Sequence, residues 1–300
     1  MNRNTGDFLE YESQYLTIDG IKMHYVDTGG SKPTVLFLHG LPANLYLWRN
    51  IVPRVSQHAR AIAIDMIGFG KSDKPFHIEY NLENYTYFLE AFIKELDLKN
   101  IIIVAMDLGL MIGLNYAMSH ESNIKGIVMF EGFFQPADEV FKNMSLSSRI
   151  IMKIFKNQRI AEKAFVEKGD KSVGDMISMM TRRKLSQDEM QHYQESFADK
   201  LVRRKVWMEG IGPNTIYPYS KSAGDIADLI NQYSAKLIYS DIPKLLLYAN
   251  PGATVRKKAV KKARENINKL TVKYIGKGKH FLPEDQPENI AEAIIGFLSE

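Results

Sequence analysis

The chain contains no cysteine among its 300 residues. Disulfide bonds, a thiolate nucleophile and a cysteine-ligated metal site are therefore excluded. No apolar run is long enough to cross a membrane. Residues 1–13 are polar and lack the apolar stretch of a signal peptide, so we expect a cytoplasmic protein. We expect neither a cofactor nor a bound metal.

The chain also lacks a large excess of charge of one sign, because it has 39 basic and 35 acidic residues and a net charge of only +4. The densest basic run has helical spacing and could suggest a nucleic-acid or membrane patch. It consists of Arg256, Lys257, Lys258, Lys261, Lys262 and Arg264. No aromatic residue interleaves the run, which favours a solvated helix face. We therefore expect no nucleic-acid or membrane partner, and we leave the oligomeric state open.

What is present is the composition of an ordinary globular protein, with 45% hydrophobic and 25% charged residues. Apolar runs that read as buried strands alternate with helical segments. The predicted strands are 34–38, 61–64, 101–106, 124–130, 244–249 and 271–275, after a hairpin at Asp19 and Gly20. The predicted helices are 45–55, 85–98, 107 to about 120, 226–238, 255–266 and 288–298. This alternation predicts an α/β fold with a largely parallel sheet covered on both faces.

The pattern changes in the middle of the chain, where residues 133–218 give no strand signal. Helical segments rich in lysine and methionine fill this stretch. We therefore predict a helical cap at 133–218, inserted into a core domain made of residues 1–132 and 219–300. The methionines could shape an adaptable apolar pocket, although methionine at such positions is more often plain core.

One stretch, from Ile101 to Gly113, carries a motif with a chemical meaning. A run of β-branched residues ends at Asp107, and a helix-compatible apolar segment follows at once. Ala105 and Gly109 lie two positions on either side of the acid, which is typical of a strand-to-helix elbow that presents a nucleophile. The helix dipole there would favour the carboxylate anion. The alternative is a simple helix N-cap.

Asp107, Glu131 and His280 each follow a predicted strand, in the α/β-hydrolase order of nucleophile, acid and histidine. Catalytic groups of such sheets lie at the carboxyl ends of the strands. A carboxylate can attack an electrophilic carbon and form an ester, which a histidine held by an acid can then hydrolyse through water. Taken singly, Glu131 could cap a helix of the cap domain and His280 could be a surface loop residue. Together they predict a catalytic triad.

The segment His39-Gly40-Leu41-Pro42 follows another predicted strand. In α/β hydrolases this loop supplies one backbone N–H of an oxyanion hole, and the residue after the nucleophile supplies the other. Leu41 and Leu108 are the corresponding residues here. We interpret His39 as a buried hydrogen-bonding residue rather than a second base. We assign no chemistry to the polar loop that contains Asp65, Gly68, Gly70, Ser72 and Asp73.

With these motifs in place, the sequence resembles the haloalkane dehalogenases of the α/β-hydrolase superfamily over most of its length. The matching segments are 39–42, 46–50, 67–75, the Asp107 elbow, Glu131, Trp207 and 280–287. The resemblance implies an α/β-hydrolase fold with a cap and an aspartate nucleophile. A glutamate after the strand that precedes the cap is typical of one subfamily.

The sequence departs from this family at the residues that hold the leaving halide. The family has Trp directly after the nucleophile and, in this subfamily, Asn after His-Gly, whereas this chain has Leu108 and Leu41. Met106 stands where His is usual. Each lost hydrogen bond to a charged group is worth roughly 1.5–3 kcal/mol, so losing both would slow halide release on the order of a thousandfold. Trp207 is a possible substitute donor, although its family counterpart looks structural.

These departures leave three readings of the function open. The first is a dehalogenase-like hydrolase with an apolar substrate. The second is an epoxide or ester/lactone hydrolase, because an oxygen leaving group does not depend on the lost donors. An epoxide would need a tyrosine donor, for which Tyr193, Tyr217 and Tyr219 are candidates, although packing is the commoner role. The third is a small-molecule binding protein without turnover.

Overall fold

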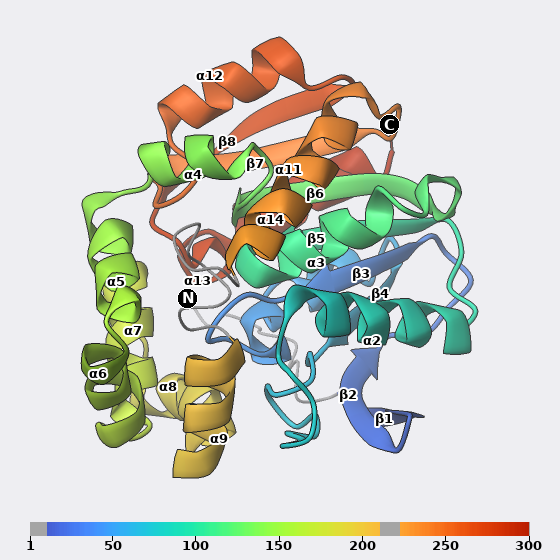
Figure 1. The fold of residues 1–300 in the computed structure, drawn as a ribbon. Coiled ribbons are helices and arrows are strands. Elements are labelled where there is room, and N and C mark those ends of the chain that lie inside the picture. The colour runs from blue at the N-terminus through green and yellow to red at the C-terminus, as the bar shows by residue number, and fades with distance from the viewer. Residues whose placement is uncertain (1–10, 211–222, 300) are drawn as a thin grey trace.

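The computed structural model describes residues 11–210 and 223–299. Tyr217 and Tyr219, together with the predicted boundary between residues 218 and 219, lie outside the described residues. The described part of the chain is built around one eight-stranded sheet, with helices on both of its faces (Figure 1). No helix in it is both long and apolar enough to cross a membrane.

The sheet is mostly parallel, as the sequence predicts. Its strands are β1 (Gln14–Ile18), β2 (Ile21–Asp27), β3 (Thr34–Leu38), β4 (Arg60–Ile64), β5 (Ile101–Met106), β6 (Ile124–Gly132), β7 (Lys244–Pro251) and β8 (Leu270–Gly278). Their order across the sheet is β1-β2-β4-β3-β5-β6-β7-β8. β2 pairs antiparallel with β1 and β4, and the remaining pairs are parallel. β3 precedes the segment 39–42, which we call the oxyanion loop, and β5 precedes the elbow, so the two strands that lead to these segments are neighbours.

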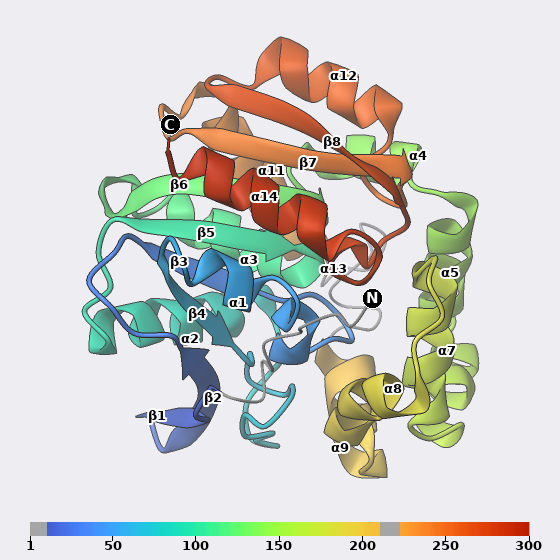
Figure 2. The same cartoon turned by 180° about the vertical axis from the view of Figure 1, so that it is seen from behind.

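Amphipathic and apolar helices cover both faces of this sheet. One face carries α2 (Leu82–Glu95), α3 (Asp107–Ala117) and α11 (Ala223–Tyr239), which lie in front of the strands in Figure 1. The other face carries α1 (Val52–Val55) and α14 (Pro287–Phe297), which lie in front in Figure 2. α12 (Lys257–Asn266) packs against β8 at the edge of the sheet and carries the basic run.

The observed helix bounds differ from the predicted ones by up to three residues, and at two helices a named residue explains the difference. The single helix predicted for 45–55 is two short ones, a 3-10 helix η2 (Leu45–Trp48) and α1, because Pro53 lacks an N–H donor and interrupts a continuous run. The helix predicted for 85–98 begins and ends three residues earlier, as α2. The Asn81 side chain accepts a hydrogen bond from the Asn84 N–H, which fixes that start.

The described residues between β6 and α11 form helices and no strand. They are α4 (Ala137–Asn143), α5 (Leu146–Lys156), α6 (Gln158–Ala161), η4 (Glu162–Glu167), α7 (Lys171–Met180), α8 (Gln187–Gln194), η5 (Glu195–Phe197), α9 (Lys200–Arg204) and η6 (Lys205–Gly210). We call this set the inserted helices. In Figure 2 the arrowheads of β5 and β7 point toward the side where α5 to α9 lie. The inserted helices thus face the carboxyl edge of the sheet.

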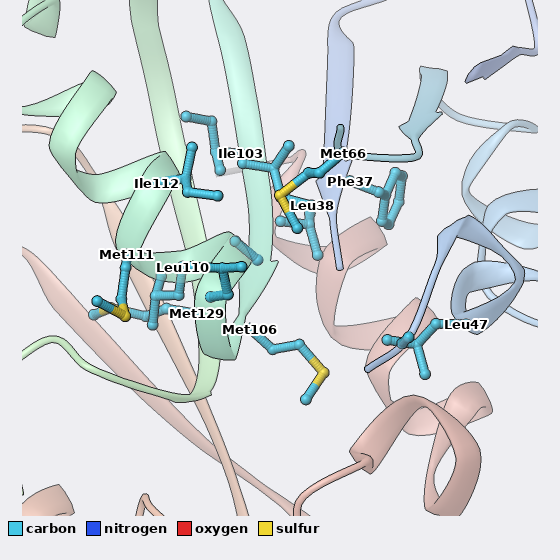
Figure 3. Packing of buried hydrophobic residues seen from close by; sticks show 14 of the residues in the cluster. Phe37, Leu38, Leu47, Met66, Ile103, Met106, Leu110, Met111, Ile112 and Met129 are labelled. Carbon is cyan, nitrogen blue, oxygen red and sulfur yellow. The ribbon is translucent and has the colours of Figure 1, made fainter. Parts of the chain in front are cut away.

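The core lies where α3 packs on the central strands. Leu38 and Ile103 project from β3 and β5 toward Ile112 of α3 (Figure 3). These side chains are at most 1% exposed, and nearly every position of α3 is buried. α3 is therefore apolar all round, which holds its first residue, Asp107, in a fixed position above the sheet.

Candidate active site

Asp107 lies at the sharp turn from β5 into α3, as the elbow pattern predicts. Its φ is 49°, a left-handed conformation that a non-glycine residue adopts at a cost of about 1–3 kcal/mol. Met106 is in the extended N-cap position, and the helix has no side-chain cap hydrogen bond. The interpretation of Asp107 as a simple N-cap is therefore wrong. Its carboxylate is left available for contacts outside the helix.

Two glycines let the neighbouring backbone come close to this turn. A Cβ on Gly40 would lie 2.4 Å from the Asp107 Cβ atom. A Cβ on Gly109 would lie 2.4 Å from the Leu38 carbonyl oxygen. Real Cβ atoms do not approach so closely, so a side chain at either position would force the elbow and the oxyanion loop apart. Gly40 and Gly109 are therefore required by this contact.

The close approach brings a backbone donor to the carboxylate. The Leu41 N–H donates to Oδ1 of Asp107 over 2.9 Å. Burial alone would raise the pKa of Asp107, but His280 and the backbone N–H groups of Leu41 and Leu108 outweigh it and lower that pKa below its usual value. The Leu108 side chain is only 3% exposed and the Leu41 side chain is partly buried. The two residues offer backbone N–H groups to this carboxylate.

Glu131 lies near the carboxyl end of β6 and is fully buried. Its φ of 43° is also left-handed. Oε2 accepts hydrogen bonds from the backbone N–H of Thr254 over 2.8 Å and of Ala253 over 3.1 Å. These donors, from the loop after β7, hold the carboxylate in one orientation. Glu131 therefore does not cap the inserted helices, which was the alternative.

His280 lies after β8 between the two carboxylates and is 3% exposed. Its Nδ1 is 3.4 Å from Oε2 of Glu131, and its Nε2 is 3.3 Å from Oδ2 of Asp107. The backbone N–H of His280 donates to the Met180 carbonyl at the end of α7 over 3.0 Å. The alternative of a surface loop residue is therefore wrong. The structure brings the three predicted residues together at the carboxyl edge of the sheet.

The two carboxylates change the proton affinity of the histidine between them. Burial would lower the pKa of His280, but Asp107 and Glu131 outweigh it and raise that pKa to about 9. At neutral pH the imidazole is therefore a cation paired with two anions. Loss of the charge on either acid would lower this pKa, since the attraction that raises it would be gone.

His39 lies beside this group and is fully buried, as we predict from the sequence. Its Nδ1 donates to the Gly40 carbonyl over 3.0 Å, and its Nε2 accepts from the Met66 N–H over 3.2 Å. Burial lowers its pKa, which agrees with a neutral ring that accepts one hydrogen bond and donates another. It holds the oxyanion loop and is not positioned as a second base.

Tyr193 and Trp207, which the sequence suggests as donors, both pack against other residues of the inserted helices or the core. Tyr193 is fully buried and its hydroxyl donates to Glu284, so it takes the packing role rather than that of an epoxide donor. Trp207 is 1% exposed and stacks on Phe165, with ring centroids 5.1 Å apart and an interplanar angle of 7°. Both side chains contribute to the packing of the inserted helices.

A charged cluster that no sequence motif indicates joins the inserted helices to the core. Glu284 is 2% exposed, and Arg49 donates to both of its oxygens over 2.6 and 2.9 Å. Arg183 contacts Glu284 and donates to Glu189 over 2.8 and 2.9 Å. Burial would raise the pKa of Glu284, but Arg49 and Arg183 lower it. The carboxylate is therefore ionised.

The same connection is made by the next residue, Asp285. Its Oδ1 accepts from the backbone N–H of Arg182 over 2.7 Å, and its Oδ2 accepts from that of Lys279 over 2.9 Å. One side chain thus ties the end of α7 to the residue before His280. The only sequence signal for these contacts is the position of both acids, four and five residues after His280 in a segment that matches the dehalogenases.

This geometry, a sheet of this order with an acid elbow and a histidine after its last strand, is that of an α/β hydrolase. The α/β hydrolase fold family model matches residues 33–287. Among the described residues, no group of three or more histidine, aspartate and glutamate side chains could hold a metal ion.

Similar proteins show to which group of α/β hydrolases the chain belongs. A haloalkane dehalogenase of Agrobacterium fabrum is 31% identical over 93% of this chain and 89% of its own. Another, from Sphingobium indicum, is 32% identical over 96% of this chain and 95% of its own. The crystal structure of the haloalkane dehalogenase DatA from Agrobacterium tumefaciens C58 has a TM-score of 0.86 at 29% identity, with 96% of both chains covered. The chain belongs to the haloalkane dehalogenase-like α/β hydrolases and is a hydrolase.

Proposed function

We propose that the protein hydrolyses a small apolar substrate through a covalent ester on Asp107. His280 is the general base in this proposal, and Glu131 orients it. The observation that carries the proposal is the position of His280 within 3.4 Å of both acids, with one ring nitrogen toward each. A buried imidazole between two carboxylates at the carboxyl edge of the sheet has no packing reason to be there.

In the first step Oδ2 of Asp107 attacks a saturated carbon of the substrate. A C–O bond forms as the bond to the leaving group breaks, and the leaving group takes the electron pair. The family relationship favours an alkyl halide as substrate, because the relatives are haloalkane dehalogenases. A carboxylate with a lowered pKa needs no separate base for this attack.

The second step follows from the change in charge. Once Asp107 is an ester, one of the two anions that raise the pKa of His280 is gone, so His280 releases its proton and becomes a base. It takes a proton from water as the water oxygen attacks the ester carbon. The N–H groups of Leu41 and Leu108 would hold the resulting oxyanion. The ester C–O bond then breaks, and the alcohol takes the proton from His280.

The apolar side chains of Leu41 and Leu108 favour a second candidate, in which the leaving group is an oxygen. Neither side chain can donate a hydrogen bond to a departing halide. An epoxide, ester or lactone reacts through oxygen and depends on the backbone donors instead. Tyr193 does not supply an epoxide donor, because its hydroxyl is bonded to Glu284. A binding protein without turnover is disfavoured, because it would not need an acid, a base and a nucleophile together.

The domain division is part of the same proposal. We assign residues 133–218 to a helical cap and residues 1–132 and 219–300 to the core. The support is the run of inserted helices between β6 and α11 and their position at the carboxyl edge of the sheet. A cap in this place would cover Asp107 and provide the apolar surroundings of the substrate.

Trapping the ester tests the proposal directly. A His280→Phe variant keeps the nucleophile but cannot activate water, so a substrate adduct should accumulate on Asp107. We would incubate it with bromoalkanes, epoxides and esters and measure the adduct by intact mass and peptide mapping. An adduct from a bromoalkane supports the first candidate, and adducts from epoxides or esters alone support the second.

The matched control carries Asp107→Asn in addition to His280→Phe and should give no adduct at residue 107 with any compound. If the single variant also gives none with the whole panel, or if the adduct maps to another residue, the assignment of Asp107 as nucleophile is wrong.

A further inference from the structure

Ser13, His24 and Asp65 form a hydrogen-bonded group at a cavity separate from the candidate active site. His24 Nδ1 is 2.7 Å from Oδ2 of Asp65, and His24 Nε2 is 3.0 Å from Oγ of Ser13. His24 and Asp65 are at most 2% exposed, whereas Ser13 is exposed. We propose that this group is a second reactive site, in which Ser13 is a nucleophile toward small aryl esters.

The surrounding hydrogen bonds fix the direction of the protons in this group. Asp65 accepts backbone N–H groups from Leu45 over 2.7 Å and from Lys71 over 2.8 Å, so its carboxylate is held in place. The acceptor at Asp65 places the proton of His24 on Nδ1. Nε2 is then the acceptor that faces the Ser13 hydroxyl. This is the tautomer that a serine nucleophile requires from its base.

A cavity of about 380 Å³ opens in front of Ser13. Its lining includes Tyr11, Tyr46 and His192, and the rings of Tyr46 and His192 are stacked 4.0 Å apart. Since Tyr46 is stacked on His192 and Arg49 lies over its ring, the two residues form an aromatic wall of the cavity, which suits an aryl group. Asp107, Glu131 and His280 are not among the lining residues, so this cavity is distinct from the site described above.

Lys71 supplies the positive charge that the reaction needs at this cavity. Its ammonium group is 3.4 Å from Oγ of Ser13 and lines the same space. A cation at this distance favours the serine alkoxide over the alcohol and is close enough to stabilise the anionic oxygen of an attacked carbonyl.

The reaction balances as an acyl transfer. Ser13 Oγ forms a bond to the carbonyl carbon of the ester, and its proton passes to Nε2 of His24. The bond from carbon to the aryl oxygen breaks, and the phenol leaves with the proton from His24. Water then attacks the acyl-serine and gives its proton to His24. The acid is released as Ser13 recovers its hydrogen.

The first test uses a probe whose adduct is stable. Full-length Asp107→Asn protein, in which the carboxylate nucleophile is absent, is incubated with diethyl p-nitrophenyl phosphate and mapped by mass spectrometry. We expect one diethylphosphoryl group on Ser13 and a rate of modification at least about tenfold lower when Ser13→Ala is added. Ser119→Ala is the matched control and should leave the rate unchanged, because that exposed hydroxyl donates to the Asn115 carbonyl instead.

The second test uses the absence of cysteine from the chain. A Ser13→Cys variant carries the only thiol of the protein, next to His24, and Ser119→Cys carries a single thiol at the control position. Iodoacetamide at neutral pH should alkylate the thiol at position 13 at least about tenfold faster, because His24 and Lys71 favour the thiolate. Equal alkylation rates, together with no phosphoryl group on Ser13, would show that the hydrogen bonds among Ser13, His24 and Asp65 only hold the N-terminal segment in place.

Discussion

Two buried histidines of this protein contact carboxylates, and their surroundings differ in one respect. His280 lies between Asp107 and Glu131, whereas His24 lies between Asp65 and the hydroxyl of Ser13. Two anions raise the pKa of His280 to about 9 and keep it protonated until one of them reacts. In the reaction that we propose for Ser13, the nucleophile is a neutral hydroxyl and His24 acts as the base in the first step. Under the two proposals, the nucleophile decides when each histidine acts.

The largest expected effect comes from Asp107→Asn. An amide cannot form the ester, so turnover should fall by at least about 10⁴-fold. The same change removes one of the carboxylates that raise the pKa of His280, and we expect that pKa to fall. Steady-state rates and an NMR titration of the histidines measure both effects. Unchanged proton affinity of His280 in a folded variant would contradict the proposed dependence of its pKa on Asp107.

Glu284→Gln tests whether the charged cluster around Glu284 anchors the inserted helices to the core. Loss of the buried charge leaves Arg49 and Arg183 without their shared partner, and breaking such a pair typically costs about 3–5 kcal/mol. The free energy of unfolding from urea titration measures this cost.

The control is Glu288→Gln, whose wild-type carboxylate is about half exposed and 3.8 Å from Arg54, and it should change stability by less than about 1 kcal/mol. An equal effect of the two variants would mean that the charged cluster does not anchor the inserted helices.

Adding side-chain donors at the two positions where the resemblance to dehalogenases implies them tests which leaving group the protein uses. Leu41→Asn with Leu108→Trp should raise bromide release on the order of a thousandfold, because two donors are regained. Burst and steady-state halide assays measure it. Leu108→Phe, which adds a ring without a donor, is the control for size. If the double variant releases bromide no faster than wild type, the missing donors do not limit the reaction.

The smallest expected effect is a dependence of stability on pH. The folded-state pKa of His280, about 9, exceeds its ordinary value of 6.5, so this group contributes its full stability below pH 6.5. Between pH 6.5 and 9 the unfolded chain loses the proton first, and stability falls by on the order of 1–3 kcal/mol. Urea unfolding at several pH values should show a shallower fall in His280→Gln. A slope equal to that of wild type would assign the fall to other groups.

Much of the fold and the three residues of the candidate site could be predicted from the sequence, because these features are local. Five mostly buried strands, β3 to β7, read as largely apolar runs, and the elbow needs only residues 105–109. The order of Asp107, Glu131 and His280 then follows from the order of the strands. Where prediction failed, as at the start of α2, a side-chain cap decided the boundary rather than the apolar period.

Only the tertiary structure decided which distant polar groups meet. Arg49 and Glu284 are 235 residues apart in the chain, and Asp65 is 41 residues from His24. No spacing rule links such residues, because their contact depends on how β2, β4 and α13 (Leu282–Asp285) are placed by the packed sheet. The sequence by itself determined the strands, the elbow and the absence of thiol chemistry. The fold determined the charges around each histidine, and those charges set its chemistry.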